Sequence, residues 1–142
     1  MIRFISHSVD ETEQFAQQFA ARLRAGDLIA CTGGLGMGKT AFARGLARGL
    51  GLRDEVSSPT FALVHEYTQG ALPLYHFDMY RITDLYDLES TGFYDYLERD
   101  GVLFIEWSEQ IAPALACMNA IRLTIARVDE DTREIIIEGA EA

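Results

Sequence analysis

The stretch T-G-G-L-G-M-G-K-T, residues 32–40, decides the fold of this chain. From Gly33 onward it matches G-x-x-x-x-G-K-[ST], the phosphate-binding P-loop. Glycines permit positive φ and remove the Cβ atoms that would keep a phosphate away from the backbone N–H groups. In this motif the lysine reaches the β- and γ-phosphates, and the threonine hydroxyl holds Mg²⁺. The sequence therefore predicts nucleotide phosphate binding by Gly33, Gly34, Leu35, Gly36, Met37, Gly38, Lys39 and Thr40.

The residues on either side supply the strand and the helix that a P-loop joins. Residues 28–32, L-I-A-C-T, form an apolar run typical of a buried strand. Residues 41–50 carry their large apolar side chains at helical spacing. Lys39 is the only lysine in the chain, against eleven arginines. The motif thus has the compact ammonium that it requires, in a chain that otherwise uses arginine.

Strand and helix signals continue along the rest of the chain. Apolar or alternating runs predict further strands at residues 2–6, 62–68, 72–79, 102–105, 121–128 and 134–138. Helices are predicted from the capping box at Ser8 to Gly26, from Thr83 to Gly92, at 93–97, and at 108–115 with an interruption at Pro113. This order predicts an α/β, P-loop NTPase-like sandwich with a mixed, mostly parallel central sheet flanked by helices, in a single domain over residues 1–142.

Composition is that of an ordinary soluble globule. The 142 residues are 49% hydrophobic and 24% charged, with no apolar run long enough to span a membrane and no signal peptide at the N-terminus. Cys31 and Cys117 make no disulfide framework, and Cys31 falls in a predicted buried strand. We therefore expect a cytoplasmic, reducing compartment and an inert core thiol at Cys31.

Charge is unevenly distributed along the chain. The net charge is −10, and residues 56–142 hold sixteen acidic residues against five basic ones. Such a surface repels a polyanion, so strong direct binding of nucleic acid is not expected. A basic protein partner is compatible with this charge, as is a surface that is simply solvated.

Two acids that end apolar strands are candidates for nucleotide chemistry. Asp78 follows Y-H-F and Glu106 follows V-L-F-I, which places both where ligands bind in α/β sheets. Glu106 has the better context for a Mg²⁺ ligand, and either acid could orient the attacking water. Arg81 could pair with Asp78 or reach a phosphate. Trp107, the only tryptophan, could wall the nucleotide pocket or pack in the core.

A polar loop and a histidine pair complete the set of candidates. The hydroxyls of the Ser57-Ser58-Pro59-Thr60 loop follow the predicted P-loop helix, as switch residues near a γ-phosphate do. An ordinary proline turn is the alternative. His65 and His76 lie on predicted paired strands, where a metal site is possible but core or partner contacts are commoner.

Four motifs in this order, G-G-L-G-M-G-K-T, S-S-P-T-F, H-F-D-M-Y-R and I-E-W-S-E, resemble the TsaE (YjeE) family of small bacterial P-loop ATPases. The resemblance covers essentially the whole chain. It implies slow ATP hydrolysis that supports threonylcarbamoyladenosine formation at position 37 of tRNA. The family acts with a threonylcarbamoyl transferase subunit and its paralogous scaffold protein, and the transfer itself belongs to the partner.

The resemblance also implies roles for individual residues. Lys39 and the loop amides would bind the phosphates of ATP, and Thr40 and Glu106 would hold Mg²⁺. Asp78 would be a catalytic or metal-linked acid, and Thr60 would lie near the γ-phosphate. The residues expected near the nucleotide are Trp107 and, towards its base, Thr12 and Arg133.

Three positions depart from the family pattern. Gly34 stands where an acid is usual, Ala41 where threonine is usual, and Ser108 where proline usually follows Glu-Trp. None of the three removes a predicted phosphate or Mg²⁺ ligand, but Gly34 loosens the loop.

Sequence features separate an ATPase from some other nucleotide-binding proteins. A GTPase needs N-K-x-D, yet the single asparagine, Asn119, precedes Ala120 and the only lysine is Lys39. A small-molecule kinase would need an acceptor pocket and an arginine-bearing lid, and no arginine-rich insertion is present. A non-catalytic nucleotide-sensing subunit remains open, because the P-loop alone does not separate it from an ATPase.

Overall fold

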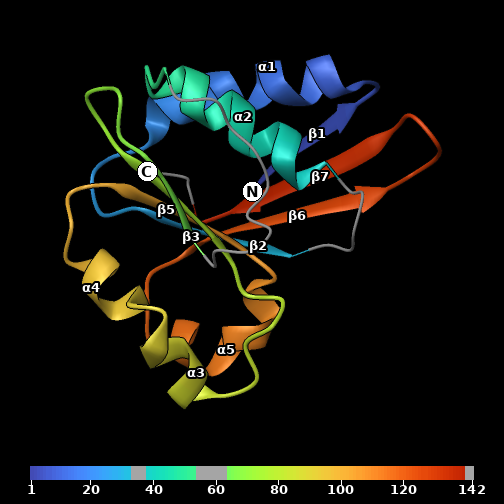
Figure 1. The fold of residues 1–142 in the computed structure, drawn as a ribbon. Helices are drawn as coiled ribbons and strands as arrows, with labels where there is room; N and C mark the ends of the chain where they lie inside the picture. The colour runs from blue at the N-terminus through green and yellow to red at the C-terminus, as the bar shows by residue number, and fades with distance from the viewer. Residues whose placement is uncertain (33–37, 54–63, 140–142) are drawn as a thin grey trace.

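Seven strands form one sheet in the part of the chain that the computed structural model describes, residues 1–32, 38–53 and 64–139 (Figure 1). Their order across the sheet is β1-β7-β6-β2-β5-β4-β3. The strands are β1 (Ile2–Ser6), β2 (Leu28–Thr32), β3 (Val64–Tyr67), β4 (Leu74–Asp78), β5 (Val102–Glu106), β6 (Ile121–Arg127) and β7 (Arg133–Glu138).

The centre of the sheet is parallel and its edges are antiparallel. β2 pairs in parallel with β5 and β6, and β4 pairs in parallel with β5. β1 and β7, β6 and β7, and β3 and β4 pair antiparallel. All five residues of β5 are buried, as expected for a parallel strand covered on both faces. The predicted α/β class with a mixed, centrally parallel sheet flanked by helices is confirmed.

Helices cover the two faces of the sheet in separate layers (Figure 1). α1 (Val9–Phe19) and α2 (Lys39–Gly49) lie on one face, where Phe42 packs on Phe104 of β5 with ring centroids 6.0 Å apart. On the other face, Phe93 packs on Phe77 of β4 at 5.6 Å. That layer contains α3 (Leu85–Ser90), α4 (Phe93–Leu97), the short 3₁₀ turn η2 (Ser108–Ile111) and α5 (Ala112–Leu115).

Two glycines allow α1 and α2 to pack closely. A Cβ added to Gly45 would lie 2.7 Å from the Cβ of Ala16 and would overlap the carbonyl oxygen of Glu13, and one added to Gly49 would lie 2.5 Å from the Cβ of Ala20. Only glycine, which has no Cβ, fits at these two positions. The contact fixes α2, and therefore Lys39 at its start, against the preceding helix.

Several predicted boundaries shift when the chain is folded. α1 ends at Phe19 and passes through a 3₁₀ turn, η1 (Ala20–Arg22), so it is shorter than the expected helix to Gly26. The α3 cap is Asp84, whose side chain accepts the Asp87 N–H, rather than Thr83. Pro113 lies in the first turn of α5, where its missing N–H is tolerated, rather than interrupting a helix. None of the described helices is long and apolar enough to cross a bilayer.

The Gly45 contact yields a stability prediction. Gly45→Ala forces α1 and α2 apart, and we expect the free energy of unfolding to fall by about 1–3 kcal/mol despite the better helix propensity of alanine. Urea denaturation measures the change. Gln14→Ala, on the exposed side of α1, is the control and should stay within about 0.5 kcal/mol of the parent. An unchanged midpoint for Gly45→Ala would show that the two helices do not need this close approach.

Candidate functional site

Candidate site residues converge at the edge of the sheet where the parallel strands end. In the strand register Cys31 of β2 faces Glu106 of β5, and Glu106 faces Asp78 of β4. β2 ends at Thr32, and α2 starts at Lys39. Adjacent parallel strands end together, so the lysine and both acids predicted from the sequence lie at one edge, the usual place for ligands in α/β sheets.

The first turn of α2 combines a helix N-terminus with a buried ammonium. Gly38, at the N-cap, has φ of 97°, a left-handed conformation that favours glycine. Lys39 follows it and is only 6% exposed. Its Nζ lies 4.4 Å from the centroid of the Trp107 ring. Thr40 is half-buried in the same turn. The N-terminus of a helix binds anions well, because its first N–H groups have no partner within the helix.

Glu106 is a buried carboxylate, only 4% exposed. Its Oε2 lies 3.2 Å from Nε2 of His76, which is fully buried on β4. Although this distance is short, neither ring nitrogen of His76 reaches a partner with hydrogen-bond geometry among the described residues. The two side chains are therefore in close contact without a hydrogen bond between them. A buried carboxylate of this kind is costly unless a cation or hydrogen bonds compensate it.

The segment after β4 brings Asp78 and Trp107 together through Tyr80. Oδ1 of Asp78 accepts the backbone N–H of Tyr80 at 2.9 Å, which fixes the orientation of the carboxylate. The Tyr80 ring lies 4.9 Å from the Trp107 ring. Trp107 has φ of 58°, the only left-handed conformation of a non-glycine residue among the described residues. This backbone conformation turns the chain sharply after Glu106, and the indole ring lies against both Lys39 and Tyr80.

Thr12 and Arg133 are both neighbours of Ser6, at the same edge beyond β6. Ser6 ends β1 and faces Arg133 of β7 in the strand register. The Ser6 hydroxyl lies 2.7 Å from that of Thr12, which is buried in the first turn of α1. Nη1 of Arg133 donates to the carbonyl oxygens of Asp129, Glu130 and Thr132 in the β6–β7 turn. The structure thus groups these two residues, and their predicted contact with a nucleotide base stays a prediction.

Some predicted positions lie outside the described residues. These are Gly33, Gly34, Leu35, Gly36 and Met37 of the motif, and Thr60 with the rest of the Ser-Ser-Pro-Thr loop. His65 and His76 face each other in the strand register. In the described ranges no group of three or more His, Cys, Asp and Glu side chains is arranged to hold a metal ion.

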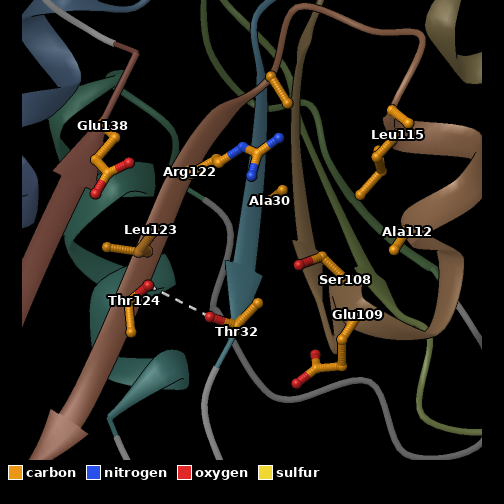
Figure 2. Close-up of a pocket in the computed structure, with 12 residues that line it drawn as sticks. Ala30, Thr32, Ser108, Glu109, Ala112, Leu115, Arg122, Leu123, Thr124 and Glu138 are labelled. Atoms are coloured by element: carbon orange, nitrogen blue, oxygen red, sulfur yellow. Dashed lines mark hydrogen bonds between the residues drawn. The ribbon is translucent and has the colours of Figure 1, made fainter.

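A separate cavity of about 550 Å³ lies on the α5 side of the sheet, away from α2 (Figure 2). Thr32 lines it beside Thr124, and their hydroxyl oxygens are 3.4 Å apart. Ser108, at one of the positions that depart from the family pattern, also lines this cavity. Its described lining includes neither Lys39 nor Glu106, so the cavity is distinct from the cluster at the strand edge.

Sequence reasoning missed two contacts of this cluster. It considered His76 together with His65, whereas the charged neighbour of His76 is Glu106 on the adjacent strand β5. It assigned nothing to Tyr80, whose ring lies against Trp107. The order of the strands is needed to find the first contact, and the left-handed turn at Trp107 to find the second. The aromatic residues that flank the two acids were the available signal.

Cys31 lies at the end of β2 beneath this cluster. Burial raises the pKa of its thiol far above the ordinary value, the charge of Lys39 acts in the opposite direction, and that of Glu106 adds to the increase. Reactivity of cysteine requires the thiolate. The expectation of an unreactive core thiol is therefore supported by burial, which outweighs the opposing charge of Lys39.

This contrast predicts that one thiol of the folded protein reacts. Ellman's reagent should modify Cys117, which is exposed, and leave Cys31 unmodified until guanidinium unfolds the chain. Cys117→Ser should abolish the rapid reaction of the folded protein, and Cys31→Ser should leave it unchanged. Rapid modification of two thiols under native conditions would contradict the buried position of β2.

Comparisons with known proteins agree with this architecture. The model of the family "Threonylcarbamoyl adenosine biosynthesis protein TsaE" matches residues 6–135. The tRNA threonylcarbamoyladenosine biosynthesis protein TsaE of Bacillus subtilis (strain 168) is 40% identical over 126 residues, which are 89% of this chain and 78% of the relative. The protein of that name from Treponema pallidum (strain Nichols) is 35% identical over 136 residues, 96% and 99% of the two chains.

A solved structure supports the same assignment. The crystal structure of YdiB from Bacillus subtilis superposes with a TM-score of 0.78 at 33% sequence identity, covering 96% of this chain and 83% of that one. The family model, the relatives and the fold agree over nearly the same residues, and the chain belongs to the TsaE family of tRNA threonylcarbamoyladenosine biosynthesis proteins.

Proposed function

We propose that this protein is a Mg²⁺-dependent ATPase that supports formation of threonylcarbamoyladenosine at position 37 of tRNA. In this proposal it acts on a partner complex, a threonylcarbamoyl transferase subunit and its paralogous scaffold, rather than on tRNA directly. Membership of the TsaE family supports the pathway. The observation that carries the ATPase is the buried Lys39 at the first turn of α2, beside the strand end that bears Glu106.

Phosphate binding follows from the start of α2. The N–H groups of its first turn and the Lys39 ammonium would hold the β- and γ-phosphates, because both present positive charge to the same edge. The chain lacks the N-K-x-D motif for guanine, which favours ATP over GTP. Trp107 would lie next to the bound phosphates, since its ring already contacts Lys39.

Thr40 and Glu106 are suited to hold Mg²⁺. Magnesium prefers oxygen ligands, and a hydroxyl with a carboxylate is a common protein contribution to its coordination. The carboxylate of Glu106 is desolvated, which favours a nearby cation. When bound, the ion neutralises charge on the β- and γ-phosphate oxygens. His76, in contact with Glu106, would hold this carboxylate in place.

Water activation would fall to the acids at the strand ends. Asp78 is half-buried, and its carboxylate is fixed by the Tyr80 N–H. That fixed orientation suits a group that positions an attacking water. Thr60 would approach the γ-phosphate, as the family resemblance implies. We propose that the protein works in the cytoplasm, where tRNA modification takes place and where free thiols such as those of Cys31 and Cys117 persist.

Kinetics of variants test the ATPase. Lys39→Ala should abolish ATP turnover, and Glu106→Gln should lower it ~10²-fold or more while weakening the Mg²⁺ dependence of nucleotide binding. Both rates are measured alone and with the transferase and scaffold, which should raise the rate of the parent protein. Glu109→Gln, an exposed acid three residues away, is the matched control and should keep the parent rate.

The same assay separates the alternatives. A parent rate with all partners no higher than that of Lys39→Ala would leave only a nucleotide-sensing role. Labelled phosphate transferred from ATP to a small acceptor would instead support a small-molecule kinase. An unchanged rate for Glu106→Gln would move the metal-binding role to Asp78.

A further inference from the structure

Three large side chains with apolar surface are exposed close together in the sequence after β4. Tyr80 is 54% exposed, Leu85 52% and Tyr86 79%. They lie within seven consecutive residues, whereas the other exposed large apolar residues of the described chain are spread over four further places: Met1, Val9, Tyr94 and Val128. Single exposed apolar residues are normal, but a group of them marks an interaction surface. We call these three residues the Tyr80–Tyr86 surface.

The Tyr80–Tyr86 surface is held rigidly by the chain beneath it. Ile82 and Leu88 point into the core and are 4% and 0% exposed. The carboxylate Oδ2 of Asp87 accepts both the N–H of Thr83 at 3.2 Å and its hydroxyl at 2.6 Å. These bonds lower the pKa of Asp87 and tie the loop to the first turn of α3. The tyrosines are therefore presented by a fixed backbone, and binding through them costs little ordering.

The charge around this surface selects the chemistry of its partner. Residues 80–100 contain six acidic residues and two basic ones. Of the basic residues, Arg99 is paired with Glu66 at 3.2 Å, and Arg81 is exposed next to Tyr80. The segment therefore keeps an excess of negative charge. Asp84 and Glu89 are exposed on either side of Leu85 and Tyr86. This charge repels nucleic acid and anionic membranes. Tyrosine rings framed by carboxylates instead match arginine, which binds both groups and is enriched at protein interfaces.

Contacts link the surface to the proposed nucleotide site. The Tyr80 ring touches the Trp107 ring, and that ring lies over Nζ of Lys39. The backbone N–H of Tyr80 donates to Asp78, and Nε2 of Gln110 donates to the carbonyl oxygen of Tyr80 at 3.2 Å. A protein that covers Tyr80 would therefore press on Trp107 through the ring contact and on Asp78 through the backbone hydrogen bond.

We propose that the Tyr80–Tyr86 surface docks an arginine-bearing face of the partner complex and that Tyr80 transmits this contact to Trp107 and Lys39. This inference rests on the proposed function, since it names the surface through which partners raise ATP turnover. Binding and turnover are separate measurements, so the two proposals can fail independently.

The test compares variants in calorimetric titrations with the purified transferase–scaffold complex. Tyr86→Ala should weaken binding about tenfold or more, the effect expected for an exposed anchor, and leave basal turnover within twofold of the parent. Glu89→Lys should weaken binding and reduce its sensitivity to salt. Val9→Ala, which removes another exposed apolar side chain, from α1 on the opposite face of the sheet, is the control and should bind like the parent.

Tyr80→Ala tests the link to the site. It should lower the turnover reached at saturating partner more than it lowers affinity, whereas Tyr80→Phe should restore the turnover. Parent-like binding by Tyr86→Ala and Glu89→Lys would overturn the docking surface. Loss of tRNA or anionic-vesicle binding in these variants, with protein binding intact, would overturn the assignment to a protein partner. A parent protein that binds the complex through this surface but hydrolyses no ATP would overturn only the proposed ATPase.

Discussion

Burial of the Lys39 ammonium at the first turn of α2 is the constraint on which the rest of the structure depends. The N-terminus of a helix carries partial positive charge, so a cation there is disfavoured until an anion approaches. The Trp107 face, 4.4 Å from Nζ, offsets part of that cost with a contact worth about 2 kcal/mol when desolvated. In the proposed function a bound phosphate would offset the rest of that cost, because it places negative charge at the same helix N-terminus.

The burial of Lys39 is supported by close packing of the elements on either side of it, α2 and β5. Gly45 lets α2 lie against the backbone of α1, and the buried carboxylate of Glu13 lies 3.5 Å from Arg44 and 3.2 Å from Arg48 of α2. β5, buried along its whole length, holds Glu106 on the other side. Loosening either support would let water reach the charges and would weaken their interaction with a ligand.

Local signals in the sequence predicted the helices and strands well. Contacts between residues far apart in the sequence were harder to predict. Three local signals act over only a few residues and can be recognised in the sequence: the capping box at Ser8, the apolar run of β5 and the glycine before α4. α1 ended earlier than Gly26 because Leu23 turns back into the core, a tertiary effect. The partner of His76 depended on β4 lying beside β5, a strand order that no local pattern encodes. The residues of the candidate site were predictable, because they end strands or follow the glycine motif. The contacts among them were not.

The left-handed backbone at Trp107 places the indole ring between groups that belong to the two helix layers. Such a conformation costs a bulky residue about 1–2 kcal/mol and persists only where neighbours over-determine it. Here the neighbours come from both faces of the sheet, with Lys39 of α2 on one side and the Tyr80 segment, leading into α3, on the other. Because β5 ends one residue earlier at Glu106, a shift of this turn changes the position of the indole and of the carboxylate together. Glycine would adopt this conformation without strain, so the ring contacts with Lys39 and Tyr80 account for a tryptophan at this position.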